Sequence, residues 1–382
     1  MKMKRSKWLM VTLILLLAIL LISCVSCTTQ KVSNQGNRSE NQQESQSGDS
    51  QDSTQNKPDG QEVAQEGEKA YPSESELAAW QANEAGKVMI LMYHVIGAAK
   101  EGAWAQTTAN FRRDLTMLYE QGYSLISLRD FINNNINVPA GRTPVILTFD
   151  DGTTGHFRYL TDEEGNRKID PECAVGILLD FGREHPLFGH TATFYVNNDP
   201  PFSQNNHWQE KLRETVALGF DIGNHTITHA MLNKLSAEGV QKELAGIPKL
   251  VEETVSDYKV DSLALPYGLS PREYNLAVQG AYEGYTYEHQ AVLKVGANPA
   301  VSPVVKGFDP TKLPRVLANT EELAKWLTYF QKNPTQRYIS DGNPQTIAIP
   351  AEKEELLDQS KVGDKVLLIW GKNAVETSGE QK

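Results

Sequence analysis

Cysteine is scarce in this chain of 382 residues, which contains only Cys24, Cys27 and Cys173. Beyond the first thirty residues a single thiol remains, and it has no cysteine partner within the same region. This scarcity excludes a fold held together by disulfides. The chain must instead be stabilised by a hydrophobic core, and its length of about two conventional domains is sufficient for one.

Basic residues are outnumbered by acidic ones, 37 against 48, which gives a formal net charge of -11 at pH 7. Proteins that bind nucleic acid neutralise phosphates with Lys and Arg. The deficit therefore argues against a nucleic-acid partner.

Long apolar runs are absent except at the N-terminus, where basic residues precede an apolar run from Trp8 to Ile22. This run is too short to span a membrane comfortably and is typical of an export signal. It ends in Leu21-Ile22-Ser23-Cys24, which resembles the lipobox of bacterial lipoproteins. The resemblance implies a signal peptide over residues 1–23, lipidation of Cys24, and an extracytoplasmic protein anchored to the cell membrane by lipid. An uncleaved N-terminal anchor helix is the alternative.

Apolar residues are almost missing from Thr28 to about Ala82, where Gln, Ser, Asn, Glu and Gly dominate. Such a segment cannot bury enough surface to offset the entropy of ordering it. We therefore predict a disordered polar linker over residues 24–86. A folded domain over 87–350 and a C-terminal extension over 351–382 complete the predicted organisation.

Short β-branched runs alternate with longer amphipathic stretches after Gly86, the pattern of parallel strands joined by helices. This pattern predicts an α/β fold. The expected helices cover Asn110–Gln121 and Ser236–Ser256. The expected strands are Val88–His94, Ser124–Leu128, Val145–Phe149, Ala192–Val196, Asp221–Gly223, Ser262–Leu265 and Leu313–Leu317.

Two adjacent carboxylates, Asp150 and Asp151, follow one of these strands and precede Gly152. Because successive strand residues face opposite ways, both can serve one site only if the turn redirects the second carboxylate. Gly152 permits such a turn. The plain alternative is that Asp-Gly is simply a frequent turn dipeptide.

Two histidines, His225 and His229, are spaced four residues apart, which on one helical turn would direct both imidazoles to the same point. Two His and one Asp form a catalytic rather than a structural metal site, because positions stay open for water and substrate. Zinc is the expected ion by ligand softness, with cobalt, nickel or iron as alternatives. A chance histidine pair on a solvated helix is the competing interpretation.

Together, Thr148-Phe149-Asp150-Asp151-Gly152 and His225-Thr226-Ile227-Thr228-His229 resemble the first two motifs of the polysaccharide deacetylase family of carbohydrate esterases. The resemblance implies a distorted (β/α) barrel and a metal-dependent hydrolase that removes N-acetyl groups from an N-acetylglucosamine-containing cell-envelope polysaccharide. It also implies that Asp150 is the general base and that Asp151, His225 and His229 hold the metal. The expected partner is an N-acetylated glycan polymer.

The family's third motif, Arg-x-Pro-Tyr-Gly, is present only as Leu265-Pro266-Tyr267-Gly268 after Ala264, without its arginine. That arginine would orient the base. Arg315 is a candidate substitute, since a guanidinium from a neighbouring strand could bind the same carboxylate; a surface arginine is the alternative. By the same resemblance, the backbone N–H of Tyr267 would stabilise the oxyanion.

The late histidine that serves as general acid in the family is also missing, because the last histidine is His289. Tyr93-His94, at the end of the first expected strand, resembles the branch of the family that deacetylates poly-N-acetylglucosamine. The resemblance makes His94 the candidate general acid, and a buried structural histidine the alternative.

Two other functions stay open from the sequence. The missing arginine and late histidine are compatible with a non-catalytic glycan-binding lipoprotein of the same fold, and the same site could remove O-acetyl groups. Aromatic side chains that could stack on sugars, or merely fill core and surface, are Trp104, Trp208, Tyr267, Tyr282, Tyr285 and Tyr287.

Overall fold

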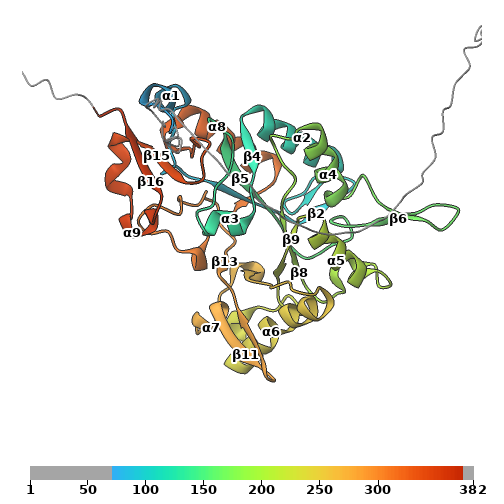
Figure 1. Ribbon diagram of the computed structural model, residues 1–382. Coiled ribbons are helices and arrows are strands. Elements are labelled where there is room, and N and C mark those ends of the chain that lie inside the picture. Colours follow the sequence, from blue (N-terminus) through green and yellow to red (C-terminus); the bar gives the residue numbers. More distant parts are fainter. Residues whose placement is uncertain (1–70, 373–382) are drawn as a thin grey trace, which may run out of the picture. The chain divides into compact units, whose positions relative to one another are not determined.

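The computed structural model describes residues 71–372 of the chain (Figure 1). The predicted signal peptide and the predicted lipidation site Cys24 lie outside this range. Within it, none of the helices is both long enough and apolar enough to cross a membrane.

A parallel sheet forms the centre of the described region. Its neighbouring strands follow the order β13-β10-β9-β8-β5-β1-β14, and β4 pairs with the first residues of β5. The bounds are β1 Met89–Tyr93, β4 Tyr123–Leu125, β5 Thr143–Phe149, β8 Thr193–Val196, β9 Asp221–Asn224, β10 Ser262–Ala264, β13 Ala291–Leu293 and β14 Val316–Leu317.

The two ends of this sheet meet through the segment that leads into β14. Val316 pairs with Leu91 of β1, while Leu313, three residues earlier, forms a parallel bridge with Leu293 of β13. One short segment thus bonds both to β1 and to β13 at the other end of the sheet, which curls the sheet into a distorted barrel. The predicted α/β barrel class is confirmed.

Alternation along the strands divides the core into an inner and an outer part. Met89 and Leu91 pack in the outer cluster with the surrounding helices, whereas Val88 and Ile90 belong to an inner cluster. In β5, Ile146 likewise belongs to the inner cluster and is followed on the same face by Thr148. The period of two therefore directs the next residue on that face, Asp150, toward the barrel interior.

Helices cover the outside of the barrel (Figure 1). Each of the longer ones presents an apolar stripe to the strands, and most begin at a Ser, Thr or Asn whose side chain accepts a backbone N–H. Their bounds are α2 Thr108–Glu120, α3 Leu128–Ile132, α4 Ala174–Glu184, α5 Trp208–Ala217, α6 Ala237–Thr254, α7 Asn275–Val278 and α8 Thr320–Lys332.

The N-terminal part of the described region packs on a second, small parallel sheet made of β15 (Thr346–Pro350) and β16 (Val366–Trp370). Helix α1 (Glu74–Trp80) buries Leu77 in a cluster with Ala348, next to Leu368 and Trp370. Short helix α9 (Gln359–Val362) connects the two strands.

The predicted end of the polar linker at residue 86 is therefore wrong. Ser73 and Glu76 form a capping box that starts α1, and the segment that follows is tied into the fold by backbone bonds such as Asn83 N–H to Ile339 O at 2.8 Å. The segment has a polar composition, but one short amphipathic helix and a few buried polar residues are enough to hold it in the fold.

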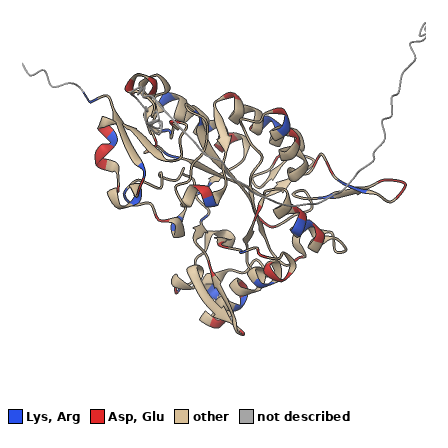
Figure 2. Cartoon of the chain, viewed as in Figure 1, with Lys and Arg blue, Asp and Glu red and all other residues tan. Residues whose placement is uncertain are grey.

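Short hairpins and turns complete the structure. Antiparallel β11 (Gln279–Tyr282) and β12 (Tyr285–Glu288) pack with α6 and α7, while β2 (Val95–Ile96) pairs with β3 (Ala105–Gln106). Strands β6 (Tyr159–Thr161) and β7 (Arg167–Ile169) form a projecting hairpin whose tip is acidic (Figure 2).

Candidate active site

The carboxyl ends of the barrel strands carry the predicted site residues. His94 directly follows β1, Asp150 and Asp151 follow β5, and His225 follows β9. Parallel strands bring their carboxyl ends to one rim of a barrel, which is where barrel enzymes place their sites. The structure therefore gathers residues that are up to 131 positions apart in the chain, from His94 to His225.

Asp150 is held by Arg315 in a buried ion pair with two hydrogen bonds. Nη1 and Nη2 of Arg315 donate to Oδ1 and Oδ2 of Asp150 at 2.6 and 2.7 Å. Nη1 also donates to Oγ1 of Thr148 at 3.2 Å, and Nε donates to the carbonyl of Lys294 at 3.1 Å. The guanidinium reaches the carboxylate because residue 315 lies in the segment that closes the barrel.

The charge of Asp150 follows from this pairing. Burial alone would raise the pKa of its carboxyl, but the attraction of Arg315, with smaller contributions from His225 and His94, outweighs burial and holds the pKa well below its usual range. Asp150 is therefore an ionised acceptor at neutral pH.

Asp151, His225 and His229 converge on one point. Oδ1 of Asp151 lies 3.4 Å from Nε2 of His225 and 3.5 Å from Nε2 of His229, and ligand atoms of the three residues lie within 4.8 Å of one another. One carboxylate oxygen and two imidazole nitrogens are a donor set that suits zinc and related divalent ions.

The chemistry of His225 fits a metal ligand. Its Nδ1 lies 2.8 Å from the carbonyl of Ala264, which only accepts, so Nδ1 carries the proton and Nε2 is left with its lone pair. That Nε2 is buried and has no hydrogen-bond partner among the described residues. Metal-binding histidines are oriented in the same way, by a second-nitrogen bond to a carbonyl or carboxylate.

The predicted helical turn over His225–His229 is wrong, since these residues form a loop after β9. Thr226 and His229 have φ of 64° and 55°, which no α-helix allows. The loop is instead fixed from outside: Oδ1 of Asn224 accepts the N–H of Thr226 at 2.9 Å, and a side chain of α6 binds Thr228.

That side chain is Glu243, which binds Thr228 through both carboxylate oxygens. Oε2 accepts the Thr228 N–H and Oε1 accepts its hydroxyl, each at 2.9 Å, and the backbone carbonyl of Glu243 accepts the N–H of Ile227. These contacts give the loop a curvature that brings both imidazoles together without a helix.

The turn after β5 also uses left-handed backbone. Asp151 has φ of 79° and Gly152 has φ of 56°, so the redirection of the second carboxylate takes place at Asp151 itself as well as at the glycine. Aspartate tolerates this region better than most residues. Such strained positions concentrate at functional sites, where surrounding contacts hold them.

His94 faces Asp150 from the neighbouring strand, with Nε2 4.0 Å from Oδ2. Burial lowers the pKa of His94, and the charges of Asp150 and Asp151 partly offset this effect. The buried His156, which the sequence did not single out, accepts the Thr153 N–H at Nδ1 (3.2 Å) and donates from Nε2 to the carbonyl of His94. His156 thus ties the loop after β5 to His94.

Tyr267 lies in a 3-10 turn after β10 with φ of 58°. Its side chain is exposed, and the edge of its ring meets His229, with centroids 4.5 Å apart. The turn brings the Tyr267 backbone to the metal-ligand side of the rim, opposite the side that carries His94.

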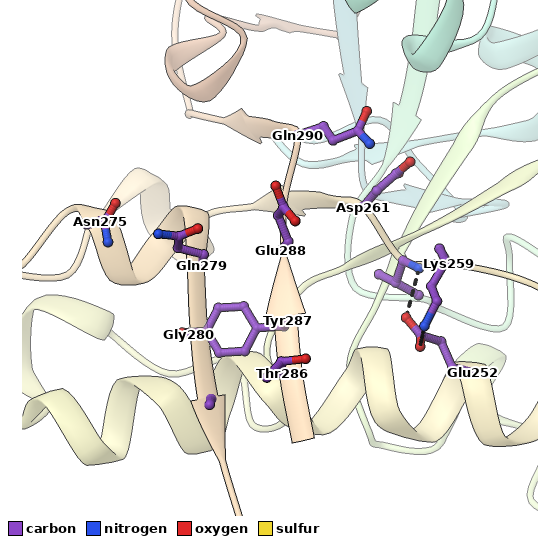
Figure 3. Close-up of a pocket in the computed structure, with 12 residues that line it drawn as sticks. Glu252, Lys259, Asp261, Asn275, Gln279, Gly280, Thr286, Tyr287, Glu288 and Gln290 are labelled. Carbon is purple, nitrogen blue, oxygen red and sulfur yellow. Dashed lines mark hydrogen bonds and ion pairs between the residues drawn. The ribbon is translucent and has the colours of Figure 1, made fainter. Parts of the chain in front are cut away.

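A cavity of about 690 Å³ lies elsewhere, under hairpin β11–β12 (Figure 3). Its lining includes Asp261 and Gln290, which directly precede β10 and β13 and so mark the amino ends of the strands. None of the predicted catalytic residues or metal ligands lines this cavity, but Tyr287, one of the candidate sugar-stacking aromatics, does.

Comparison with known proteins gives one family match and several distant relatives. Residues 137–287 match the family model for polysaccharide deacetylases. YxkH of Bacillus subtilis (strain 168), a polysaccharide deacetylase by name, is 23% identical over 203 residues, which cover 52% of this chain and 62% of YxkH. The match thus spans less than two thirds of that relative.

Solved structures show similarity at low identity. The Streptococcus pyogenes deacetylase PplD in complex with acetate is 18% identical, with a TM-score of 0.47 over 63% of this chain and 97% of that chain. BC0361, a polysaccharide deacetylase from Bacillus cereus, is 21% identical, with a TM-score of 0.46 over 63% of this chain and 69% of that chain.

The residues that match the family model include the two acids, the two metal-ligand histidines and the third-motif tyrosine: Asp150, Asp151, His225, His229 and Tyr267. His94 and Arg315 lie outside the match. Residues 137–287 are therefore similar to the polysaccharide deacetylase family, and YxkH is a distant relative by sequence.

Proposed function

We propose that this chain hydrolyses N-acetyl groups of an N-acetylglucosamine-containing cell-envelope polysaccharide, with a divalent metal, zinc foremost, held by Asp151, His225 and His229. The observation that carries the proposal is the buried pair of Asp150 and Arg315 beside these three ligands. A protein that only binds glycan has no need for a carboxylate kept ionised in the interior at the cost of burying two charges.

Each residue at the rim has a role in this proposal. A divalent cation bound to the three ligands would polarise the acetamide carbonyl and acidify water. Asp150 accepts the proton of the attacking water because Arg315 keeps its carboxylate ionised. The backbone N–H of Tyr267 stabilises the oxyanion. His94 donates a proton to the leaving nitrogen.

Arg315 takes the place of the arginine that the third motif lacks. It reaches the same carboxylate from the segment between β13 and β14 rather than from β10. His94, with the acid role, reaches the same rim from β1. The missing arginine and the missing late histidine are the two features that favour a non-catalytic protein. In this proposal Arg315, which binds Asp150, replaces the arginine, and His94, which faces Asp150, replaces the histidine.

The test is acetate release by the full chain. The protein is stripped with a chelator, reloaded with Zn²⁺ or Co²⁺, and given N-acetylglucosamine oligomers, with Asp150→Asn as the matched variant. We expect acetate release that requires metal and falls about 10²–10⁴-fold in Asp150→Asn. Metal binding without acetate release from any N-acetylated glycan would favour the glycan-binding alternative. Faster release from O-acetylated xylan than from N-acetylated oligomers would favour the esterase.

We also propose that the protein acts outside the cell on a lipid anchor at Cys24, as the lipobox resemblance implies. Labelling cells with a fatty-acid analogue tests this proposal. Label in the wild type and none in Cys24→Ala is expected, whereas equal labelling would contradict the anchor.

A further inference from the structure

His289 is a buried histidine that the proposed chemistry does not use. It lies between β12 and β13, and only 1% of its surface is exposed. Burial lowers the pKa of its imidazole to about 4, so the ring is neutral at neutral pH. A neutral imidazole has one N–H donor and one acceptor nitrogen, and its neighbours decide which nitrogen is which.

The neighbours of His289 assign its tautomer. Nδ1 lies 2.8 Å from the carbonyl oxygen of Ala277 in α7, which can only accept a hydrogen bond, so Nδ1 carries the proton. Nε2 is therefore the acceptor, and it lies 3.1 Å from Nδ2 of Asn224, the last residue of β9. His289 thus presents a lone pair, rather than an N–H, to the side chain of Asn224.

This tautomer fixes the orientation of the Asn224 amide. Nδ2 of Asn224 donates to Nε2 of His289 and, at 2.8 Å, to the carbonyl of Leu244 in α6. Because both partners are acceptors, both amide protons are used there and Oδ1 must point the other way. Oδ1 accepts the N–H of Thr226 at 2.9 Å. A reversed amide would set its oxygen against two acceptors and its NH₂ group against an N–H.

Thr226 is the point where the backbone bends between the two candidate metal-binding histidines. Its φ of 64° is a conformation that a β-branched residue keeps only when surrounding contacts hold it. It directly follows His225, and its hydroxyl accepts the N–H of Ala230, which directly follows His229, at 3.3 Å. The hydrogen bond from Thr226 to Asn224 therefore affects the backbone beside both histidines.

We propose that His289 is a positioning residue for the candidate metal site. It locks the Asn224 amide in the orientation that holds Thr226. Through Thr226 it sets the backbone from which His225 and His229 reach the metal. This inference rests on the proposed metal-dependent function and extends it to a residue that is neither a ligand nor a catalytic group, 65 positions away from Asn224 in the chain.

The test uses two polar substitutions that each keep one of the two bonds of His289. In His289→Gln, the side-chain oxygen can replace Nε2 as the acceptor for Asn224. In His289→Asn, the shorter amide can replace Nδ1 as the donor to Ala277, but it offers nothing to Asn224. His289→Leu offers neither bond and is the second variant without an acceptor, should His289→Asn not fold.

Titration of Co²⁺ into the full chain, stripped with a chelator, measures the metal site directly. We expect the cobalt affinity to fall about 10–100-fold in His289→Asn, as for other groups that orient metal ligands. The visible spectrum of its cobalt complex should change, since the two imidazoles no longer meet in the same geometry. His289→Gln should keep the affinity and the spectrum of the wild type.

Hydrogen exchange of the metal-free full chain measures the first step without metal or turnover. Exchange at the Thr226 N–H, followed by mass spectrometry in a peptide over residues 224–229, should be about 5–30-fold faster in His289→Asn, the factor that one lost hydrogen bond gives. It should be unchanged in His289→Gln. A matched control is Tyr287→Phe, which removes a buried bond from the same hairpin to α7, at 2.8 Å to the carbonyl of Leu276. That variant should change neither exchange nor the cobalt spectrum.

Two results would overturn the inference. Equal losses of cobalt affinity in His289→Gln and His289→Asn would show that packing, rather than the acceptor atom, carries the effect. A less stable His289→Asn with the affinity, spectrum and exchange of the wild type would limit His289 to a role in folding.

Failure of the deacetylase proposal itself would look different. A wild type that binds cobalt but releases no acetate from any N-acetylated glycan would refute the enzyme. The difference between His289→Gln and His289→Asn in cobalt affinity and spectrum would still support the positioning role. A wild type that binds no cobalt would remove the metal site, and this inference with it.

Discussion

Asp150 at the rim of the barrel and Glu84 at the junction with the C-terminal sheet are both buried carboxylates, yet their pKa values move in opposite directions. Burial raises the pKa of Glu84 to about 8, and the nearby charge of Asp341 adds to this effect. Asp150 is buried as completely, but Arg315 outweighs the cost and lowers its pKa. The difference shows that the partner, rather than burial, sets the charge state.

Glu84 stays neutral because burial and the charge of Asp341 outweigh its hydrogen bonds, which by themselves would favour the ionised form. Its Oε2 accepts the N–H of Ala348 at 3.0 Å, and its Oε1 lies 3.3 Å from the hydroxyl of Ser340. These neutral donors join the segment after α1 to β15. The rim thus keeps a charged group ready to accept a proton, whereas the junction uses a carboxyl group that stays protonated at neutral pH to connect two parts of the chain.

The largest expected effect comes from removing the positive charge of Arg315 from its ion pair with Asp150. Arg315→Met leaves Asp150 buried without a partner, so the free energy of unfolding should fall by about 3–5 kcal/mol. The pKa of Asp150 should rise, and acetate release should fall with it. Urea unfolding of the metal-free protein and acetate release by the zinc-loaded protein measure the two effects.

Two further variants test whether the unpaired charge of Asp150 causes the loss of stability in Arg315→Met. Arg315→Met combined with Asp150→Asn should recover part of the lost stability, because no unpaired charge is then buried. Arg183→Met breaks an exposed pair with Asp180 (3.0 Å) and should cost about 0–1 kcal/mol. An Arg315→Met protein as stable as the wild type would show that Asp150 is not charged in the fold.

The second expected effect is a dependence of stability on pH that belongs to Glu84. Between its ordinary pKa of 4.5 and its folded pKa of about 8 the unfolded chain ionises while the folded protein keeps the proton. The free energy of unfolding should therefore decrease as pH rises through this window, by a few kcal/mol at about 1.4 kcal/mol per pKa unit. Below pH 4.5 this loss is absent.

Unfolding of the wild type and of Glu84→Gln at a series of pH values measures this effect. The difference between the two proteins should change steadily from pH 4.5 to pH 8. Asp341→Asn removes the like charge and should narrow the window by lowering the pKa of Glu84. A pH-independent difference between wild type and Glu84→Gln would mean that Glu84 is ionised throughout.

The strands and the acidic pair could be predicted because buried parallel strands are continuous apolar runs, and the Asp pair directly follows one of them. The contact between Arg315 and Asp150 could only be suggested. It depends on the closure of the barrel through Leu313 and Val316, which are bonded to β13 and to β1, respectively. Closure is a property of the whole sheet that no local pattern contains.

Other features were missed although part of the signal was present. Ser73 and Glu76 have the spacing of a capping box before Leu77, which marks the start of a helix inside the predicted linker. His156 follows the acidic pair by only a few residues, but its bond to the His94 carbonyl joins two strands that are neighbours only in the folded barrel.

The histidine loop shows why spacing alone misled. A separation of four residues suits one turn of helix, yet the loop takes its shape from Asn224 and from Glu243, which is 15 positions away in the chain from Thr228. The contact with Asn224 is local, because its side chain accepts the N–H two residues later, but the Glu243 anchor exists only when α6 packs beside β9. The sequence therefore predicted which residues are the candidate metal ligands, but not the backbone conformation of the loop that carries the two histidines.

The smallest of the three expected effects tests this anchor. Glu243, like Glu84, accepts neutral donors, but here they belong to the loop that carries the metal ligands. Glu243→Gln places an amide N–H where the loop presents its own donors, so the loop should lose its curvature and metal affinity should fall about 10–100-fold, as for other groups that orient ligands.

Titration of Co²⁺ into the metal-free protein measures the affinity, and the visible spectrum of the cobalt protein reports the ligand geometry. Glu253→Gln, an exposed substitution on the same helix, should change neither. A role limited to folding would lower the unfolding free energy of Glu243→Gln while its cobalt spectrum and affinity stayed those of the wild type. A changed spectrum in a stably folded variant would instead show that the loop geometry, rather than the histidine spacing, forms the site.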